Sequence, residues 1–257
     1  MLLELLEGLD PVHLSLAAGL ITTSLNALGA TPVLFVREMP AKLMDIGLGF
    51  AAGVMMAASF TSLIIPGVDR GGLAPVAAGV LLGSYVVSIA DKVVPHMHRV
   101  IGFEGRGAER LKAVWLFVIA VALHNMPEGL AVGVSAGSGR IGDTIALALA
   151  IGVQNIPEGL SIAFSILSVE GRSRLRAFTI SLLSGIVELP LAIIGAIGVS
   201  LAEPLLPLAM GFAAGAMIFV VRDEMIPETH RLGHERRASY GLMGGLVTML
   251  VLDMLLS

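Results

Sequence analysis

Long apolar runs, separated by short polar stretches, cover most of the chain. A helix needs about 20 predominantly apolar residues to cross the hydrocarbon core of a bilayer, and each run has about that length. The chain is 56% hydrophobic and 14% charged, whereas a soluble domain is about 25% charged. The pattern predicts an all-α polytopic membrane protein, with a single transmembrane domain over residues 1–257. Its eight transmembrane helices are expected at about residues 12–36, 44–66, 72–91, 112–136, 143–168, 176–200, 204–222 and 239–256.

Basic residues are concentrated in alternate loops between these spans. Every Lys and Arg except Arg70 and Arg140 lies in one set of loops, which comprises residues 37–43, 92–112, 169–176 and 222–238. Cytoplasmic loops carry an excess of Lys and Arg, so this set is predicted to be cytoplasmic. The prediction places both termini outside and makes 92–112 the longest cytoplasmic loop.

A seven-residue pattern occurs twice, in the second and the seventh span. Residues 49–55 read GFAAGVM and residues 211–217 read GFAAGAM. The two spans cross the membrane in opposite directions, which is typical of the inverted repeats of secondary transporters. We therefore expect spans 1–3 to be related to spans 6–8, and span 4 to span 5. Small-residue packing patterns also recur by chance in glycine-rich membrane helices.

A second pair of motifs carries the chemistry. Residues 124–130 read HNMPEGL in span 4, and residues 154–160 read QNIPEGL in span 5. Ionisable groups at membrane depth are expensive and usually functional. Because residues i and i+4 share a helix face, the first and fifth residue of each motif point the same way. The proline in each motif frees a backbone carbonyl and is expected to kink its helix.

Two carboxylates that face each other in a low dielectric need a shared proton or a cation between them. Glu128 and Glu158 are such a pair, and Glu188 in span 6 is a third carboxylate for the same cavity. The motifs add the imidazole of His124 and three amide side chains, and the chain has no cysteine. Imidazole, carboxylate and amide donors without thiolate suit Zn²⁺, Fe²⁺, Mn²⁺ or Co²⁺. The residues thus predict a divalent cation site between spans 4 and 5.

Other interpretations of the buried polar residues remain open at this point. A lone His or Glu can be a hydrogen-bonded contact between helices, and paired carboxylates can relay protons in a carrier or channel. An intramembrane metalloenzyme is disfavoured because the HExxH pattern of zinc proteases is absent. The sequence also lacks a Walker motif, which disfavours ATP-driven pumping. A pI of about 5.8 and the lack of a basic patch with aromatics exclude nucleic acid as a partner.

The motifs HNMPEG and QNIPEG, on an eight-span chain with both ends outside, resemble those of the ZIP (Zrt-/Irt-like) metal transporters, in particular the bacterial branch. The resemblance extends to residues 49–67 (GFAAGVMMAASFTSLIIPG) and 222–230 (RDEMIPETH). It implies a homodimer in the cell inner membrane that takes up divalent metal into the cytoplasm and is not an enzyme. The implied metal is Zn²⁺ first, with Cd²⁺, Fe²⁺, Mn²⁺ or Co²⁺ as further candidates.

The same resemblance implies a binuclear site between spans 4 and 5, with Glu128 and Glu158 bridging two metals. The first metal would be held by the two bridging residues and by His124, Gln154 and Met55. The second would be held by the two bridging residues and by Asn125, Asn155 and Glu188. The chain departs from the family where Gln154 replaces a second histidine, because a neutral amide is a weaker ligand. A further departure is Asp223-Glu224, where a His-Glu pair is usual.

Further acids and histidines lie near the ends of the spans and are candidates for the entrance and exit of metal. Entrance candidates are Asp69 and Asp143, for which a solvated loop charge is the alternative. Asp45 is a candidate at the inner start of span 2. Exit candidates at or near the cytoplasmic side are Asp223, Glu224, His96, His98, His230 and His234, with plain solvent exposure as the alternative for the histidines.

Overall fold

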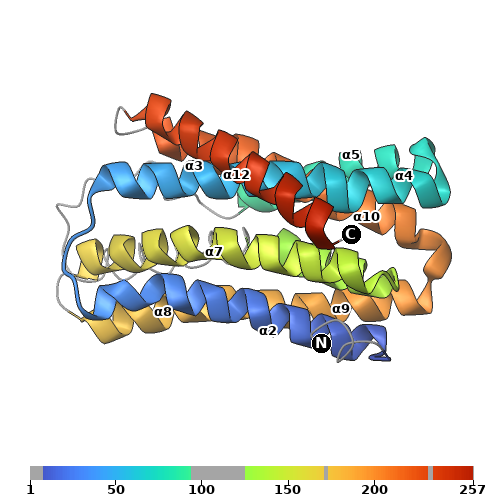
Figure 1. Ribbon diagram of the computed structural model, residues 1–257, viewed down its shortest axis with the longest axis horizontal. Coiled ribbons are helices and arrows are strands. Elements are labelled where there is room, and N and C mark those ends of the chain that lie inside the picture. Colours follow the sequence, from blue (N-terminus) through green and yellow to red (C-terminus); the bar gives the residue numbers. More distant parts are fainter. Residues whose placement is uncertain (1–7, 94–124, 171–172, 231–233, 257) are drawn as a thin grey trace.

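The computed structural model describes residues 8–93, 125–170, 173–230 and 234–256, and these form a bundle of long helices that run along a common axis (Figure 1). Seven helical segments in this described part are long and apolar enough to cross a membrane. They are Pro11–Leu34, Ala41–Gly71, Leu73–Ala90, Ile141–Leu167, Arg174–Leu201, Glu203–Thr229 and Glu235–Leu255. Each matches a predicted span. The remaining predicted span, 112–136, is described only from residue 125, where residues 125–137 are helical.

The elements follow one another with short connections. The first half contains α2 (Pro11–Ala30) with a 3₁₀ turn (Thr31–Leu34), α3 (Ala41–Ala58), a π-helical segment (Ser59–Ile64), α4 (Ile65–Gly71) and α5 (Leu73–Val93). After the helical stretch 125–137 come α7 (Ile141–Glu170), α8 (Arg174–Ile186), α9 (Glu188–Leu201) and a 3₁₀ turn (Glu203–Leu205). The chain ends with α10 (Leu206–Val220), a π-helical segment (Val221–Met225), α11 (Ile226–His230) and α12 (Glu235–Leu256).

Helix α7 lies in the middle of the bundle. It packs against α3 and α12 on one side and against α2 and α8 on the other (Figure 1). The helix continues through Pro157 from Ile141 to Glu170 without interruption. Its position between the two groups of helices places the second polar motif, residues 154–160, at the centre of the molecule.

Two helix pairs, α3 with α12 and α5 with α10, make equivalent glycine contacts. Gly49 of α3 lies against the carbonyl of Ala238, and Gly211 of α10 lies in the same way against the carbonyl of Val76. A Cβ atom at either glycine would come within 2.2 Å of that oxygen, so these backbones approach as closely as they do because the side chains are absent. Other glycines in these two pairs also lie against backbone carbonyls of the partner helix. They are Gly53, Gly241 and Gly245 in α3–α12, which correspond in order to Gly215, Gly79 and Gly83 in α5–α10.

Two membrane-spanning segments, Ala41–Gly71 and Glu203–Thr229, are longer than the predicted spans 44–66 and 204–222. Polar residues and prolines, which end helices in water, follow the apolar runs there. The structure instead continues through a π-helical segment into α4 and α11, so Asp69, Asp223 and Glu224 lie inside helices and not beyond them. A backbone within a membrane has no water to bond, which favours a continuous hydrogen-bonded helix over a loop.

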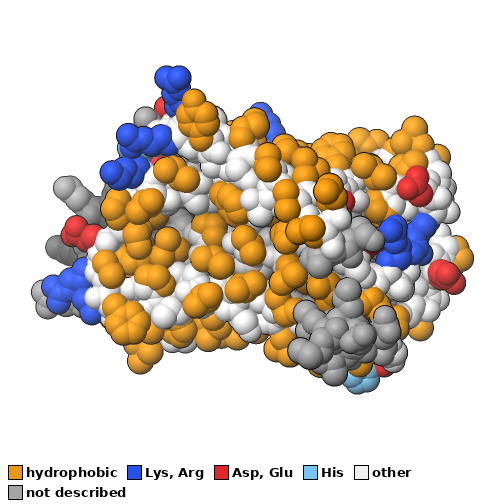
Figure 2. Space-filling view, viewed as in Figure 1, with side chains coloured by type: hydrophobic (Ala, Val, Ile, Leu, Met, Phe, Trp, Pro, Cys, Tyr) orange, Lys and Arg blue, Asp and Glu red, His pale blue; other side chains and the backbone are white. Residues whose placement is uncertain are grey.

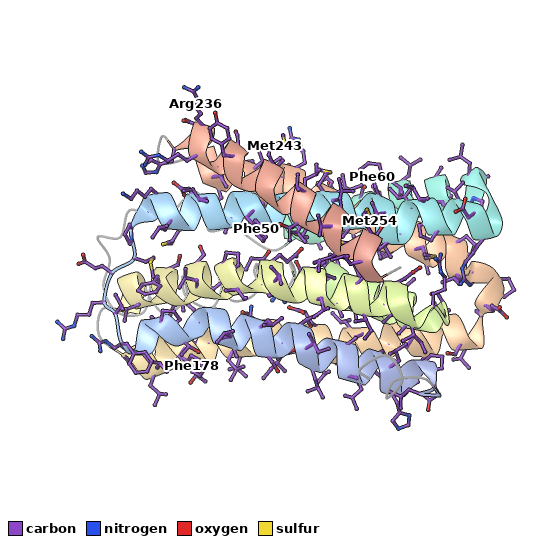
Figure 3. All side chains as sticks on the ribbon, viewed as in Figure 1. Phe50, Phe60, Phe178, Arg236, Met243 and Met254 are labelled. Carbon is purple, nitrogen blue, oxygen red and sulfur yellow. The ribbon has the colours of Figure 1, made fainter. Side chains whose placement is uncertain are left out.

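Apolar side chains cover the middle of the surface. Figure 2 shows them over the face formed by α12, α3, α7 and α2, with Lys and Arg gathered towards the two ends. Met243 and Met254 are 57% and 86% exposed and point away from the bundle along α12 (Figure 3). An exposed apolar surface of this extent is a membrane or protein interaction surface. The chain therefore has the surface of a multi-pass membrane protein.

The described basic side chains segregate as predicted. Arg236 lies at the end of the bundle where α12 begins (Figure 3), and Arg174 at the start of α8 donates to the Leu34 carbonyl at the end of the first span. Arg70 lies at the opposite end, where it donates to the carbonyl of Ser138 in the turn before α7. Which of the two ends faces the cytoplasm stays a prediction.

Candidate metal site

A layer of buried polar side chains crosses the interior between the two motifs. Seven of the eight predicted ligands lie in the described part, and all seven are buried. The six polar ones lie on the stretch 125–137, on α7 and on α9: Asn125, Glu128, Gln154, Asn155, Glu158 and Glu188. Burial of this many polar groups in an apolar protein is unfavourable unless they bind one another or a ligand. The hydrogen bonds among them indicate what they can bind.

The two motifs are joined directly by a hydrogen bond. The Nε2 atom of Gln154 donates to the Oε1 atom of Glu128 at 2.6 Å, and both side chains are fully buried. The bond confirms that spans 4 and 5 bring their motifs face to face, as the sequence predicted. It also shows what Gln154 does in place of an ionisable ligand, because the amide supplies a hydrogen atom to a carboxyl group without carrying a charge.

Glu188 reaches the same layer from α9. Asn155 donates from Nδ2 to the Oε1 atom of Glu188 at 2.8 Å. Glu188 lies in the middle of the span Arg174–Leu201, as the sequence predicted, directly after a one-residue break between α8, which ends at Ile186, and α9. Pro190 cannot donate to the carbonyl of Ile186, which favours the break at this point.

The amide side chains are oriented with their nitrogen atoms bound and their oxygen atoms available. Asn125 donates from Nδ2 to the carbonyl of Ser184 at 2.9 Å. In the described part of the chain, the Oδ1 atoms of Asn125 and Asn155 and the Oε1 atom of Gln154 are buried without a hydrogen-bond partner. Amide oxygens accept but do not donate, and together with carboxylates they are ligands for divalent cations. The donor set therefore fits a cation better than it fits an anion or an apolar ligand.

Glycines let the helices around the site approach closely. Gly129 follows Glu128 and lies against the backbone of Glu188, so that a Cβ atom would come within 2.4 Å of the Glu188 carbonyl oxygen. Gly159 follows Glu158 and would meet the carbonyl oxygen of Asn26 on α2 at 2.3 Å in the same way. In each motif a glycine therefore follows the glutamate, because a neighbouring backbone occupies the place that its side chain would take.

Replacing Gly129 by Ala is expected to weaken both the fold and metal binding. The new methyl group must push α9 and Glu188 away, and overpacking of this kind costs about 1–3 kcal/mol. Thermal unfolding in detergent and zinc titration would measure the two effects. Gly198→Ala is the matched control on α9, because a Cβ atom there meets nothing within 4 Å. Equal behaviour of the two variants would show that the close approach at Gly129 is unimportant.

Several predicted ligands remain untested. His124, His96 and His98 lie outside the described residues, and the side chain of His230 is not described either. Met55 is fully buried in the apolar core with Val132 and Ile151, where a role as a soft ligand stays a prediction. The described residues contain no group of three His, Cys, Asp or Glu side chains that could hold a metal, and the polar layer consists of amides as well as carboxyls.

The entrance and exit candidates differ in their surroundings. Asp69 is exposed, while Asp143 forms an ion pair with Arg140 at 2.8 Å. Asp223 is paired with Arg222 at 3.0 Å, and Glu224 is half-buried in the same π-helical segment. Asp143 and Asp223 each have an arginine partner, and their roles at the entrance and exit stay predictions.

The structure brings together Asp45, the candidate at the inner start of span 2, and His234, an exit candidate. The Nδ1 atom of His234 lies 2.7 Å from the Oδ2 atom of Asp45, which is largely buried on α3. The pair joins the start of α3 to the residue that precedes α12. Such a contact between residues far apart in the chain could not be read from spacing.

Asn26 on α2 is a polar residue at the site that the sequence analysis did not single out. It is fully buried beside Gly159. The sequence could have indicated Asn26 only as an amide within the first apolar run, because it belongs to no repeated motif.

Comparisons with known proteins agree with the motifs and the fold. A family model described as ZIP Zinc transporter matches residues 97–253. The zinc transporter GufA of Myxococcus xanthus is 43% identical over 250 residues, which cover 93% of this chain and 97% of the relative. The zinc transporter ZIPB of Bordetella bronchiseptica is 42% identical over 269 residues, covering 96% and 84%. The human zinc transporter ZIP11 is 34% identical over 341 residues, covering 97% and 99%.

The family match covers both of the paired motifs and the helices α7 to α11. The relatives align with nearly the whole chain, and the apolar helices have the lengths of membrane spans. The resemblance inferred from the paired motifs is thereby confirmed, and the chain belongs to the ZIP zinc transporter family.

Proposed function

We propose that this protein transports Zn²⁺ across a membrane, and that the ion passes through the buried polar layer between the two motifs. The observation that carries the proposal is the hydrogen-bonded contact of Gln154 with Glu128, next to three buried amide oxygens without hydrogen-bond partners in the described chain. Carboxyl and amide oxygens can replace the hydration shell that a cation loses when it enters the protein. The names of the relatives support zinc as the ion.

The proposed site binds two ions, with Glu128 and Glu158 between them. In this arrangement His124, Gln154 and Met55 complete one site, and Asn125, Asn155 and Glu188 complete the other. The hydrogen bond of Asn155 to Glu188 supports the second set, because it places both donors side by side. The first set depends on His124 and therefore remains the less supported of the two. The same donors also accept Cd²⁺, Fe²⁺, Mn²⁺ or Co²⁺.

We further propose eight transmembrane helices arranged as inverted repeats in a single domain. The equivalent glycine contacts of the pairs α3–α12 and α5–α10 support this relation, since α3 and α10 also run in opposite directions (Figure 1). A binding layer between two related halves suits alternating access, in which one half moves against the other. A passage between matched halves fits a transporter better than an enzyme with a one-sided active site.

The proposed direction is into the cytoplasm, across the inner membrane of the cell, with a homodimer as the functional form. The basic end of the bundle is then the cytoplasmic end. The contact of Asp45 with His234 lies at this end and gives a leaving ion a carboxyl group and an imidazole. Asp223 and Glu224 are the further acids on this proposed exit route.

Metal uptake by vesicles containing the purified protein tests the proposal. Zn²⁺ uptake should be saturable, should occur in pure lipid vesicles without ATP, and should be inhibited by competing Cd²⁺. In a second experiment, proton flux into the same vesicles is measured under a pH gradient in the absence of metal. Proton flux in the absence of any metal, together with no metal uptake, would favour the proton relay and contradict the proposal.

A further inference from the structure

Asn26 has a polar side chain that is buried in the middle of a membrane-spanning helix. Its side chain is fully buried, and neither its Nδ2 nor its Oδ1 atom has a hydrogen-bond partner in the described chain. A buried amide without partners is destabilising relative to an apolar side chain of the same size. Its presence calls for a ligand that the amide binds.

The neighbours of Asn26 belong to the segments that carry or hold the two motifs. Its carbonyl oxygen lies against Gly159, the residue after Glu158, and its amide lies against Gly185 on α8, where a Cβ atom would come within 2.7 Å of the Asn26 Cγ atom. Asn125 of the first motif binds the adjacent carbonyl, that of Ser184. The backbone of Asn26 thus lies against the second motif, and its amide lies against the part of α8 that binds Asn125 of the first motif.

Asn26 corresponds to Glu188 in the repeated architecture. Asn155 donates to the carbonyl of Thr22, four residues before Asn26, at 3.4 Å. Asn125 donates to the carbonyl of Ser184, four residues before Glu188, at 2.9 Å.

The glycines of the motifs show the same correspondence. Gly159 lies against the backbone of Asn26 as Gly129 lies against the backbone of Glu188. Position 26 therefore faces the second motif as position 188 faces the first. Position 26 has an amide, and position 188 has a carboxyl group.

We propose that Asn26 is a neutral oxygen donor for the transported cation, supplied by α2 at the position that corresponds to Glu188 on α9. This inference rests on the proposed function and adds a residue that determines how tightly the site binds. A transport site must bind its ion strongly enough to dehydrate it and weakly enough to release it. An amide at this position supplies an oxygen without adding a further negative charge.

The alternative is that Asn26 only fills space between α2, α7 and α8. Asn26→Leu separates the two, because leucine has a similar size but no oxygen. If Asn26 is a donor, Asn26→Leu raises the Tm of the metal-free protein by about 2–4 °C, since a buried polar group without partners is removed. The same change weakens zinc binding by about tenfold or more. A residue that only fills space would leave zinc affinity unchanged.

Asn26→Asp is a second test, in which zinc affinity is expected to rise. This test does not require that Asn26→Leu folds. A carboxyl group at this position should tighten zinc binding by about tenfold and slow the release of zinc into vesicles. Ser15→Ala is the control on α2, because Ser15 is equally buried but its hydroxyl donates to the carbonyl of Val12. This control should bind zinc like the parent protein.

The measurements are zinc titration calorimetry and thermal unfolding of the purified full-length protein in detergent. Weaker binding by Asn26→Leu with tighter binding by Asn26→Asp supports the proposal. Unchanged affinity in both variants, while the parent binds zinc, overturns the role of Asn26 and leaves the transport function standing. Failure of the parent protein itself to bind or transport zinc overturns the proposed function and this inference with it.

Discussion

Glu128→Gln is expected to lower zinc affinity by about three orders of magnitude. A unit charge about 4 Å from another contributes on the order of 4 kcal/mol at an effective dielectric of about 20, and about 1.4 kcal/mol corresponds to a tenfold change in affinity. The substitution removes this charge but keeps the shape of the side chain. It also keeps an oxygen that accepts the hydrogen bond from Gln154. The fold should therefore persist while binding is lost.

Zinc titration calorimetry of the purified variant measures this effect, and thermal unfolding shows whether the fold is retained. Glu203→Gln is the matched control, because Glu203 is exposed at the end of the bundle away from the polar layer. The control should bind zinc like the parent. Parent-like affinity in Glu128→Gln would show that the Glu128 carboxylate does not bind the ion.

Gln154→His is expected to tighten zinc binding by about tenfold or more and to make it dependent on pH. Imidazole is a stronger zinc ligand than an amide. Because an imidazole must be deprotonated to bind metal, the gain should be present above a pH of about 6.5 and disappear as the pH falls below it. The amide of the parent protein does not titrate, so its own contribution has no such dependence.

Zinc titrations at several pH values compare Gln154→His with the parent. Release of zinc inside vesicles should become slower in the variant, since tighter binding retards dissociation. An affinity that is unchanged at neutral pH would contradict the assignment of position 154 as a metal ligand. Gln154→Leu is a useful companion, because it removes both the oxygen donor and the hydrogen bond to Glu128.

The positions of the membrane helices could be predicted because a bilayer imposes a length and a composition on each span. The paired motifs were also predictable as facing partners, since antiparallel neighbours bring equal depths together, and the bond between Gln154 and Glu128 confirms it. These features depend on local patterns that a single sequence displays directly.

Other features depend on packing or on backbone geometry that local patterns do not display. The π-helical segment Val221–Met225 holds polar residues within a continuous helix, where the sequence suggested a loop. A one-residue break between α8 and α9 lies directly before Glu188, inside the span Arg174–Leu201. The contact of Asp45 with His234 joins residues distant in the sequence, and Asn26 is recognised only from what surrounds it.

The central claim is that zinc crosses the membrane between the two motifs, and flux through a double variant tests it most directly. Zinc entry into vesicles, followed with an indicator dye inside them, is compared for the parent protein, for Glu128→Gln combined with Glu158→Gln, and for Glu203→Gln. We expect parent-like flux in Glu203→Gln and flux indistinguishable from protein-free vesicles in the double variant. Parent-like zinc flux in the folded double variant would contradict the central claim.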